Sequence, residues 1–186
     1  EDVLQIKMCK YPEFQPATYV SAYLVDGLLI DTGPAHTALE LVDFLKDKGV
    51  RIAVNTHHHE DHISANKFLQ ESMRIEIFAH PLAVDKINQP AKLYPYQEEV
   101  WGYPVPSQVK PLGKYIKTSK YHFEVISTQG HDRDHVCIYE KDQGWLFSGD
   151  LYFSTRPSVC RPMENQWQII KDLKKLKELN SRILFP

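Results

Sequence analysis

The sequence predicts an α/β protein built from two similar halves, in which sheets pack together and helices lie outside them. Two observations predict this class. Strands and helices alternate after a β-rich start, and the same order begins again with a second β-rich stretch. Each half also contains an apolar strand that ends in an acidic tight turn, at residues 29–33 and 146–150. The 186 residues suffice for one domain with a sizeable core, so a single domain over residues 1–186 is expected.

The first half begins with strands and continues with an amphipathic helix. Residues 4–30 are predicted to be mainly strand, and Asp26-Gly27 predicts a hairpin turn because such a turn needs positive φ angles. Apolar residues at helical spacing predict a helix over residues 37–48. Gly49 stands where helices commonly end in a left-handed residue. A short apolar strand at residues 52–54 then leads directly into a histidine-rich segment.

A second helix and a further strand are expected after the histidines. Ser64 is predicted to be the N-cap of this helix, which would carry Ala65, Phe68 and Leu69 on one face. Residues 75–79 are predicted to be a strand, because a short apolar run stands there.

Residues 81–111 have a different composition, because six of the twelve prolines lie among several aromatic residues there. Such a segment is predicted to contain neither a central strand nor a long regular helix. Two interpretations remain open: a connection without function, or an insertion that forms a lid or a wall of a substrate site. The aromatic side chains that such a wall would present are Tyr94, Tyr96, Trp101 and Tyr103.

The second half is predicted to contain a strand at residues 123–127 and a hairpin that joins residues 136–140 to residues 145–148. A lysine-rich amphipathic helix is expected over residues 165–179, and residues 182–185 are expected to begin a last strand. The apolar residues expected on the buried face of the helix are Ile169, Ile170, Leu173 and Leu176.

The composition excludes several classes of protein. The chain has 22 Lys+Arg and 24 Asp+Glu, so it offers no basic surface for nucleic acid or for an anionic membrane. No apolar run approaches the ~18 residues that span a bilayer, and no signal peptide is expected at the start. Cys9, Cys137 and Cys160 are isolated from one another, which indicates free thiols and favours the reducing cytoplasm.

Histidines cluster where the strand at residues 52–54 ends, since four of the nine lie between His57 and His62. Side chains alternate in extended backbone, so His57 and His59 point to one side and His58 points away. Asp61 and His62 follow at the turn into a helix and can converge on a second point. Imidazole with carboxylate suits zinc, iron, manganese or cobalt, whereas the plain alternative is a histidine-rich surface loop.

The spacing His57-x-His59-x-Asp61-His62 resembles the metal motif of the metallo-β-lactamase fold superfamily, in particular its glyoxalase II branch. Thr128-Gln129-Gly130-His131 is similar to the second histidine motif of that family, with Gln129 where the family usually has proline. Phe147-Ser148-Gly149-Asp150 is similar to the strand that delivers a metal-bridging carboxylate, and Asp31-Thr32-Gly33 to an early Asp-x-Gly. The resemblance implies the four-layered αβ/βα sandwich.

The resemblance also implies a set of ligands for two divalent ions. Zinc is the first expectation, and iron and manganese are the alternatives. The first metal would be held by His57, His59 and His131. The second would be held by Asp61 and His62, and Asp150 would bridge the two ions.

Three further residues have expected roles beside the metals. Asp61 would also orient the attacking hydroxide or carry a proton to the leaving group. His135 would contact substrate or support the site, with a structural role as the alternative. Asp31 is expected to orient a histidine N–H rather than to bind metal.

The activity implied is metal-dependent hydrolysis, in which a metal-bound hydroxide cleaves a thioester, a lactone or another small ester-like substrate. The alternatives are a mononuclear iron oxidoreductase similar to persulfide dioxygenases and a non-enzymatic binding protein on the same fold. Substrate identity is expected to lie in residues 81–111 and 156–161, and homo-oligomer formation is left open. The chain is expected to be cut short at Pro186, before a Gly-His pair that completes the second metal site in the family.

Overall fold

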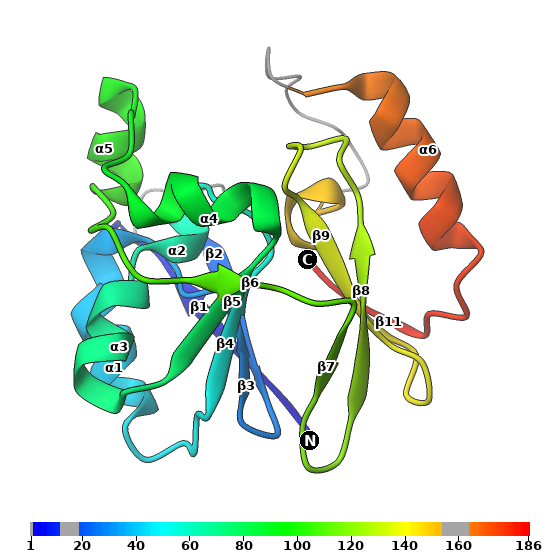
Figure 1. Ribbon diagram of the computed structural model, residues 1–186, viewed down its shortest axis with the longest axis horizontal. Helices are drawn as coiled ribbons and strands as arrows, with labels where there is room; N and C mark the ends of the chain where they lie inside the picture. The colour runs from blue at the N-terminus through cyan, green and yellow to red at the C-terminus, as the bar shows by residue number, and fades with distance from the viewer. Residues whose placement is uncertain (1, 12–18, 154–163) are drawn as a thin grey trace. The chain divides into compact units, whose positions relative to one another are not determined.

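The computed structural model describes residues 2–11, 19–153 and 164–186. They form two compact units, an N-terminal unit of residues 1–112 and a C-terminal unit of residues 113–186 (Figure 1). Each unit contains one sheet, so two sheets with accompanying helices are present as expected. Single-domain behaviour of the whole chain stays a prediction.

The N-terminal unit contains a six-stranded mixed sheet in the order β1-β2-β3-β4-β5-β6. The first three strands are antiparallel, and β3 to β6 are parallel to one another. Asp26 (φ 45°) and Gly27 (φ 83°) form the predicted turn between β2 and β3. The strands are β1 (Val3–Met8), β2 (Val20–Val25), β3 (Leu28–Ile30), β4 (Ile52–Asn55), β5 (Glu76–Ala79) and β6 (Lys110–Pro111).

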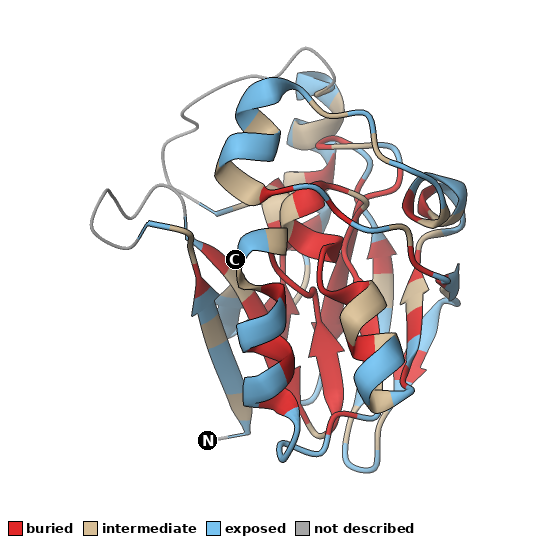
Figure 2. Cartoon of the chain, turned by 90° about the vertical axis from the view of Figure 1, so that its left-hand side faces the viewer, coloured by how far each residue is buried: buried red, intermediate tan, exposed pale blue. Residues whose placement is uncertain are grey.

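Helices α1 (Ala38–Leu45) and α3 (Asn66–Met73) lie side by side along one face of this sheet (Figure 1). Their buried side chains pack with those of the inner strands into one apolar core. The inner strands are buried, whereas β1 is largely exposed (Figure 2). The helix predicted over residues 37–48 is present as α1 but is shorter. Gly49 has the expected left-handed φ of 71°.

The predicted N-cap at Ser64 is wrong. A short helix, α2 (Glu60–Ile63), begins directly after His59, and Ser64 follows its last residue. The Ser64 hydroxyl donates to the carbonyl of Glu60, four residues back, so its side chain stabilises the preceding turn. Ala65 occupies the N-cap of α3 and offers no side-chain hydrogen bond.

The proline-rich segment contains two short helices that the sequence analysis did not predict, α4 (Pro81–Asn88) and α5 (Pro95–Trp101). Each helix begins with its proline, because the missing N–H of proline costs nothing in a first turn. Helix α5 is joined to α2 by a 2.8 Å hydrogen bond, which Nε2 of Gln97 donates to Oε1 of Glu60. The segment therefore packs against the turn that carries the histidines.

The C-terminal unit contains a five-stranded sheet in the order β11-β10-β9-β8-β7, with β10 and β11 parallel and the other pairs antiparallel. All the predicted strands of this half are present, and β7 was not predicted. The strands are β7 (Tyr115–Lys117), β8 (His122–Ser127), β9 (Val136–Glu140), β10 (Trp145–Phe147) and β11 (Ile183–Phe185).

Helix α6 (Gln166–Lys177) packs along the face of this sheet (Figure 1). Ile169, Leu173 and Leu176 contact the core as predicted. Ile170 does not, since it is 45% exposed. Asp172 is buried instead, because its carboxylate has hydrogen-bond partners in this unit. Across the described ranges, no helix is long and apolar enough to cross a membrane.

Burial raises the pKa of the Cys137 thiol on β9 to about 12, from an ordinary value of 9.0. The folded protein thus binds more protons than the unfolded chain above pH 9. We expect the contribution of this thiol to the free energy of unfolding to be intact below pH 9 and to fall by about 4 kcal/mol towards pH 12. Urea unfolding of the natural chain and of Cys137→Ala at pH 8 and pH 10.5 measures this. The expectation would be contradicted if the difference in free energy of unfolding between the natural chain and Cys137→Ala were the same at both pH values.

Candidate metal centre

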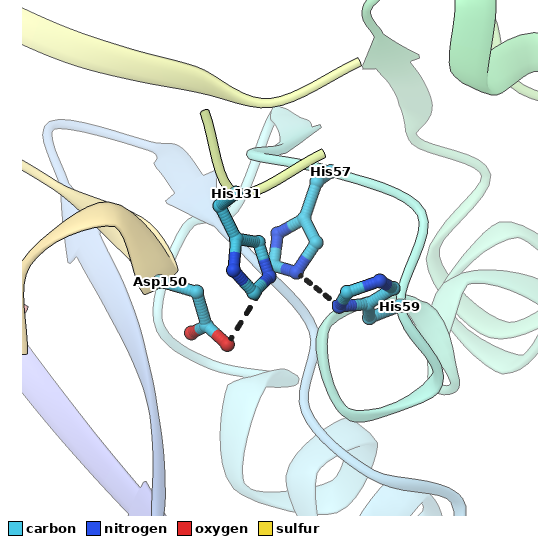
Figure 3. Close-up of side chains that lie close together, drawn as sticks. All are labelled: His57, His59, His131 and Asp150. Carbon is cyan, nitrogen blue, oxygen red and sulfur yellow. Dashed lines mark hydrogen bonds and ion pairs between the residues drawn. The ribbon is translucent and has the colours of Figure 1, made fainter. Parts of the chain in front are cut away.

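The histidine-rich turn of the N-terminal unit begins where β4 ends at the carboxyl edge of the sheet. His57 and His59 are buried, and Nε2 of His57 lies 2.9 Å from Nδ1 of His59 (Figure 3). These two rings therefore lie together as predicted, but strict alternation does not hold, because residues 56–57 form a bend and the His58 ring lies 5.0 Å from that of His59. The ring of His58 instead lies near α4, with its Nδ1 3.3 Å from Nζ of Lys86.

The other ring nitrogen of His57 is held by its neighbour, because Nδ1 lies 3.0 Å from the Thr56 hydroxyl oxygen. Thr56 is itself fixed by Asp31: its hydroxyl donates to Oδ2 at 2.8 Å and its backbone N–H to Oδ1 at 2.7 Å. Asp31 is almost fully buried and has a φ of 60°, which Asp tolerates better than most residues. One carboxylate thus anchors the start of the histidine-rich turn.

Asp31 also holds His62, whose Nδ1 lies 2.8 Å from Oδ2 of the carboxylate. The opposite nitrogen, Nε2, lies 3.6 Å from Oδ2 of Asp61. This is too long for a good hydrogen bond. The structure therefore confirms the expectation that Asp31 orients a histidine N–H, and it places Asp61 and His62 together as the sequence analysis expected.

Buried amide and hydroxyl groups fix the backbone of the same turn. The carbonyl of His62 accepts from the N–H of Thr32 at 2.9 Å and from Nδ2 of Asn55 at 3.0 Å. Asn66 closes the network, since its Nδ2 donates to Asn55 and its Oδ1 accepts from the Thr32 hydroxyl, both at 2.8 Å. Such a satisfied buried network holds one geometry, so the position of His62 is defined from both its ring and its backbone.

The C-terminal unit carries a second group of the predicted residues. His131 is 2% exposed, and its Nε2 lies 3.6 Å from Oδ2 of Asp150 (Figure 3). Its Nδ1 lies 3.0 Å from Oε1 of Glu164, just before α6. Asp150 belongs to a 3₁₀ turn that follows β10. The predicted Gly-His turn and acidic turn of this half therefore meet.

His135 lies in the same unit and is completely buried. Its ring centroid is 5.5 Å from that of His131, and its Nδ1 is 2.8 Å from the hydroxyl oxygen of Thr128. The ring is thus placed beside a predicted ligand, which suits a supporting role. Its catalytic role stays a prediction.

These groups fit a divalent metal in donor type and in spacing. Two ligand atoms of one tetrahedral ion lie about 3.3 Å apart when each bond is about 2.0 Å long. Within the units, the separations are 2.9 Å between the rings of His57 and His59 and 3.6 Å in both histidine–carboxylate pairs. In His62 and His131, a carboxylate holds the opposite ring nitrogen, which is the usual outer support of a histidine ligand. The pairs are therefore suited to binding a metal ion.

Sequence reasoning missed four residues that hold these side chains or the backbone beside them: Asn55, Asn66, Glu164 and Asp172. Asp172 left a signal, because it is a charged residue on the apolar stripe between Ile169 and Leu176. Its Oδ2 accepts the backbone N–H of Gly130 at 2.9 Å. The role of Glu164 could not be predicted, because the residue lies outside every segment with a helical or strand pattern.

Gly130 is needed because α6 passes directly against it. A Cβ at this position would lie 2.5 Å from the backbone nitrogen of Ile169, a contact that forces the helix or the turn to move. We expect Gly130→Ala to lower the free energy of unfolding by about 1–3 kcal/mol. Gly113→Ala is the matched control, because a Cβ there meets nothing within 4 Å. Equal urea midpoints for the two variants would refute this account.

Two sheets with accompanying helices define an α/β protein, and the buried histidine–carboxylate pairs in its two units suit the binding of metal ions. A profile of the family described as Metallo-beta-lactamase superfamily matches residues 16–186, so the chain belongs to that superfamily. The predicted resemblance is confirmed.

Similar sequences agree with this assignment. "Probable metallo-hydrolase YybB" of Bacillus subtilis (strain 168) is 35% identical over 143 residues, which are 74% of this chain and 62% of that protein. A "Hydroxyacylglutathione hydrolase" of Pelagibacter ubique (strain HTCC1062), a glyoxalase II, is 24% identical over 119 residues, 63% of this chain and 43% of that protein. The chain spans less than half the length of the hydroxyacylglutathione hydrolases it matches.

Solved structures show the same fold. The metallo-beta-lactamase family protein TTHA1429 from Thermus thermophilus matches with a TM-score of 0.70 and 21% identity, over 99% of this chain and 72% of that chain. TTHA1623 in a di-iron-bound form matches with a TM-score of 0.68 and 26% identity, over 93% and 85% of the two chains. The predicted fold class is therefore confirmed.

Proposed function

We propose that this chain is a dinuclear metal-dependent hydrolase that cleaves a thioester, a lactone or another small ester-like substrate. The observation that carries the proposal is the repeated pairing of a buried histidine with a carboxylate at 3.6 Å, once in each unit. In the two histidines of these pairs, a carboxylate holds the other ring nitrogen, so the nitrogen beside the pairing carboxylate is the one suited to a metal.

The proposed ligand sets are those expected from the sequence. His57, His59 and His131 would hold one ion, Asp61 and His62 the other, and Asp150 would bridge them. Zinc is the proposed metal because borderline ions suit mixed imidazole and carboxylate sets. Iron is the first alternative, since TTHA1623, at 26% identity, is described in a di-iron-bound form.

A bound divalent metal would polarise the ester-like carbonyl and lower the pKa of a water molecule that it holds. The residues of the chain would supply orientation and proton transfer. Asp31 holds the ring of His62 and, through Thr56, the ring of His57. Asp61 lies beside His62 and is partly exposed, so we propose that it passes a proton to the leaving group. His135 would support His131 by packing its ring against that of His131.

We propose that residues 81–111 form a wall of the substrate site. Two contacts support this proposal: Gln97 of α5 bonds to Glu60, and Nζ of Lys86 in α4 lies near His58. Tyr94 and Tyr96 stack with ring centroids 6.1 Å apart and are largely exposed, so their faces are accessible to a ligand. Residues 156–161, the other expected source of specificity, lie outside the described residues.

The experiment that tests the activity uses the full chain prepared without metal and reloaded with zinc, manganese or iron. Metal content is measured first, and each form is then assayed on a panel of thioesters, lactones and phosphodiesters. Hydrolysis of a thioester or lactone that rises with metal content supports the proposal. Oxygen uptake with a persulfide substrate in the iron form alone would instead identify an oxidoreductase. Metal binding without turnover of any substrate would favour a binding protein.

The cytoplasm is the proposed location, on the ground that the three cysteines are isolated from one another in the sequence. The substrate proposed above is a small molecule, in keeping with the hydrolase names of the relatives. Whether the chain forms homo-oligomers is left to measurement of its mass in solution.

A further inference from the structure

We infer that Glu164 is a positioning residue that holds His131 by its Nδ1 and thereby presents Nε2 to the metal. The inference rests on the proposed function, because it assigns His131 a role as a ligand. It adds a residue that lies outside every motif considered in the sequence. Two sets of contacts support the inference. One is made by the His131 ring, and the other joins the start of α6 to the turn that carries His131.

The carboxylate and the ring form a close buried pair. Oε1 of Glu164 lies 3.0 Å from Nδ1 of His131, and only 2% of the His131 side chain and 12% of the Glu164 side chain are exposed. A carboxylate can only accept at this contact, so Nδ1 of His131 carries the proton. Nε2 is then the nitrogen with a lone pair, and it faces Asp150.

The start of α6 is tied to the same turn through the backbone. The N–H of Asn165, next to Glu164, donates to the carbonyl of Gly130 at 2.9 Å. Farther along the helix, Asp172 accepts the N–H of Gly130 at 2.9 Å and is braced by Nε2 of Gln168 at the same distance. Gly130 is thus held at both its N–H and its carbonyl, so the turn before His131 is fixed to the start of α6, where Glu164 lies.

This arrangement makes the position of α6 a determinant of the metal site. His131 follows Gly130 directly, so any shift of the helix start moves the ring and its acceptor together. A histidine ligand whose outer nitrogen loses its acceptor can rotate and can adopt the other tautomer. Loss of Glu164 should therefore weaken metal binding without removing a ligand.

The test compares Glu164→Gln, Glu164→Asp and Glu164→Ala with the natural chain. Long-range ¹H–¹⁵N correlation spectra of the metal-free protein report the tautomer of His131, and competition with a chromophoric chelator reports zinc affinity. Glu164→Gln keeps the length and an accepting oxygen, so we expect the Nδ1–H tautomer and a zinc affinity within a few-fold of the natural value. Glu164→Asp and Glu164→Ala lose the contact, and we expect mixed tautomers and a roughly 10–100-fold weaker affinity.

The order of the variants separates positioning from charge. If only the charge of Glu164 mattered, Glu164→Asp would bind zinc better than Glu164→Gln, and that order would overturn the inference. Unchanged tautomer and affinity in Glu164→Ala would also overturn it. Glu178→Gln, at an exposed site directly after α6, controls for removal of a carboxylate that flanks this helix. A natural chain that binds none of zinc, manganese and iron would refute the proposed function, whereas the tautomers would still decide the role of Glu164.

Discussion

Asp150→Ala is expected to lose one of two metal ions and nearly all hydrolytic activity. Asp150 is the carboxylate proposed to be shared between both ions, and its removal leaves two cations without the negative charge that holds them close. The loss should exceed the roughly 10–100-fold effect of removing an outer partner of a ligand. Elemental analysis of the loaded protein gives the metal stoichiometry, and turnover of the substrate identified in the panel gives the activity.

Glu124→Ala is the control for Asp150→Ala, because it removes an exposed carboxylate from β8 of the same unit. This variant should keep both the metal content and the turnover of the natural chain. Full metal content with near-normal turnover in Asp150→Ala would refute the dinuclear proposal. A loss of activity with two metals still bound would point to Asp150 acting in proton transfer rather than as a bridge.

Asp31→Ala is expected to lower both the free energy of unfolding and the affinity for metal. The substitution leaves three buried donors without their acceptor: the N–H and hydroxyl of Thr56 and Nδ1 of His62. Breaking such a buried charged contact typically costs about 3–5 kcal/mol. Alanine at a φ of 60° adds strain to this loss. Urea unfolding and zinc competition measure the two effects.

Asp31→Asn separates these causes. Asparagine tolerates the left-handed backbone and keeps one accepting oxygen, so we expect an effect smaller than that of alanine. Asp47→Ala removes an exposed carboxylate from the same unit and should change the free energy of unfolding by less than about 0.5 kcal/mol. The account of Asp31 as the anchor of the turn would fail if Asp31→Ala unfolded at the same urea concentration as Asp47→Ala.

Most strands, helices α1, α3 and α6 and the metal-ligand types could be predicted from local pattern. The turn at Asp26-Gly27 needs positive φ angles that few other pairs supply, and His57 and His59 are so close in sequence that their rings can meet. Helix α6 follows from an apolar stripe at helical spacing. In each case the determining interactions lie within a few residues along the chain.

Other features depended on partners distant in the sequence. Ser64 has the residue type of an N-cap, yet its hydroxyl bonds back to Glu60 because α2 ends there. The short helices of the proline-rich segment begin with prolines and local caps, but the hydrogen bond of Gln97 to Glu60 that ties α5 to α2 joins residues far apart in the sequence. Ile170 is exposed and Asp172 buried because the carboxylate finds an amide at Gly130, 42 residues away.

By itself, the sequence determined the class of this protein, because ligand types and their spacing are properties of a short segment. Only the tertiary structure decided which groups orient those ligands. Asp31 lies 31 residues from His62, and Glu164 lies 33 residues from His131. A carboxylate can serve as the acceptor of a histidine from any point in the chain, provided that the fold brings it within about 3 Å and excludes water. That requirement is met by the packing of whole elements, and no local pattern encodes it.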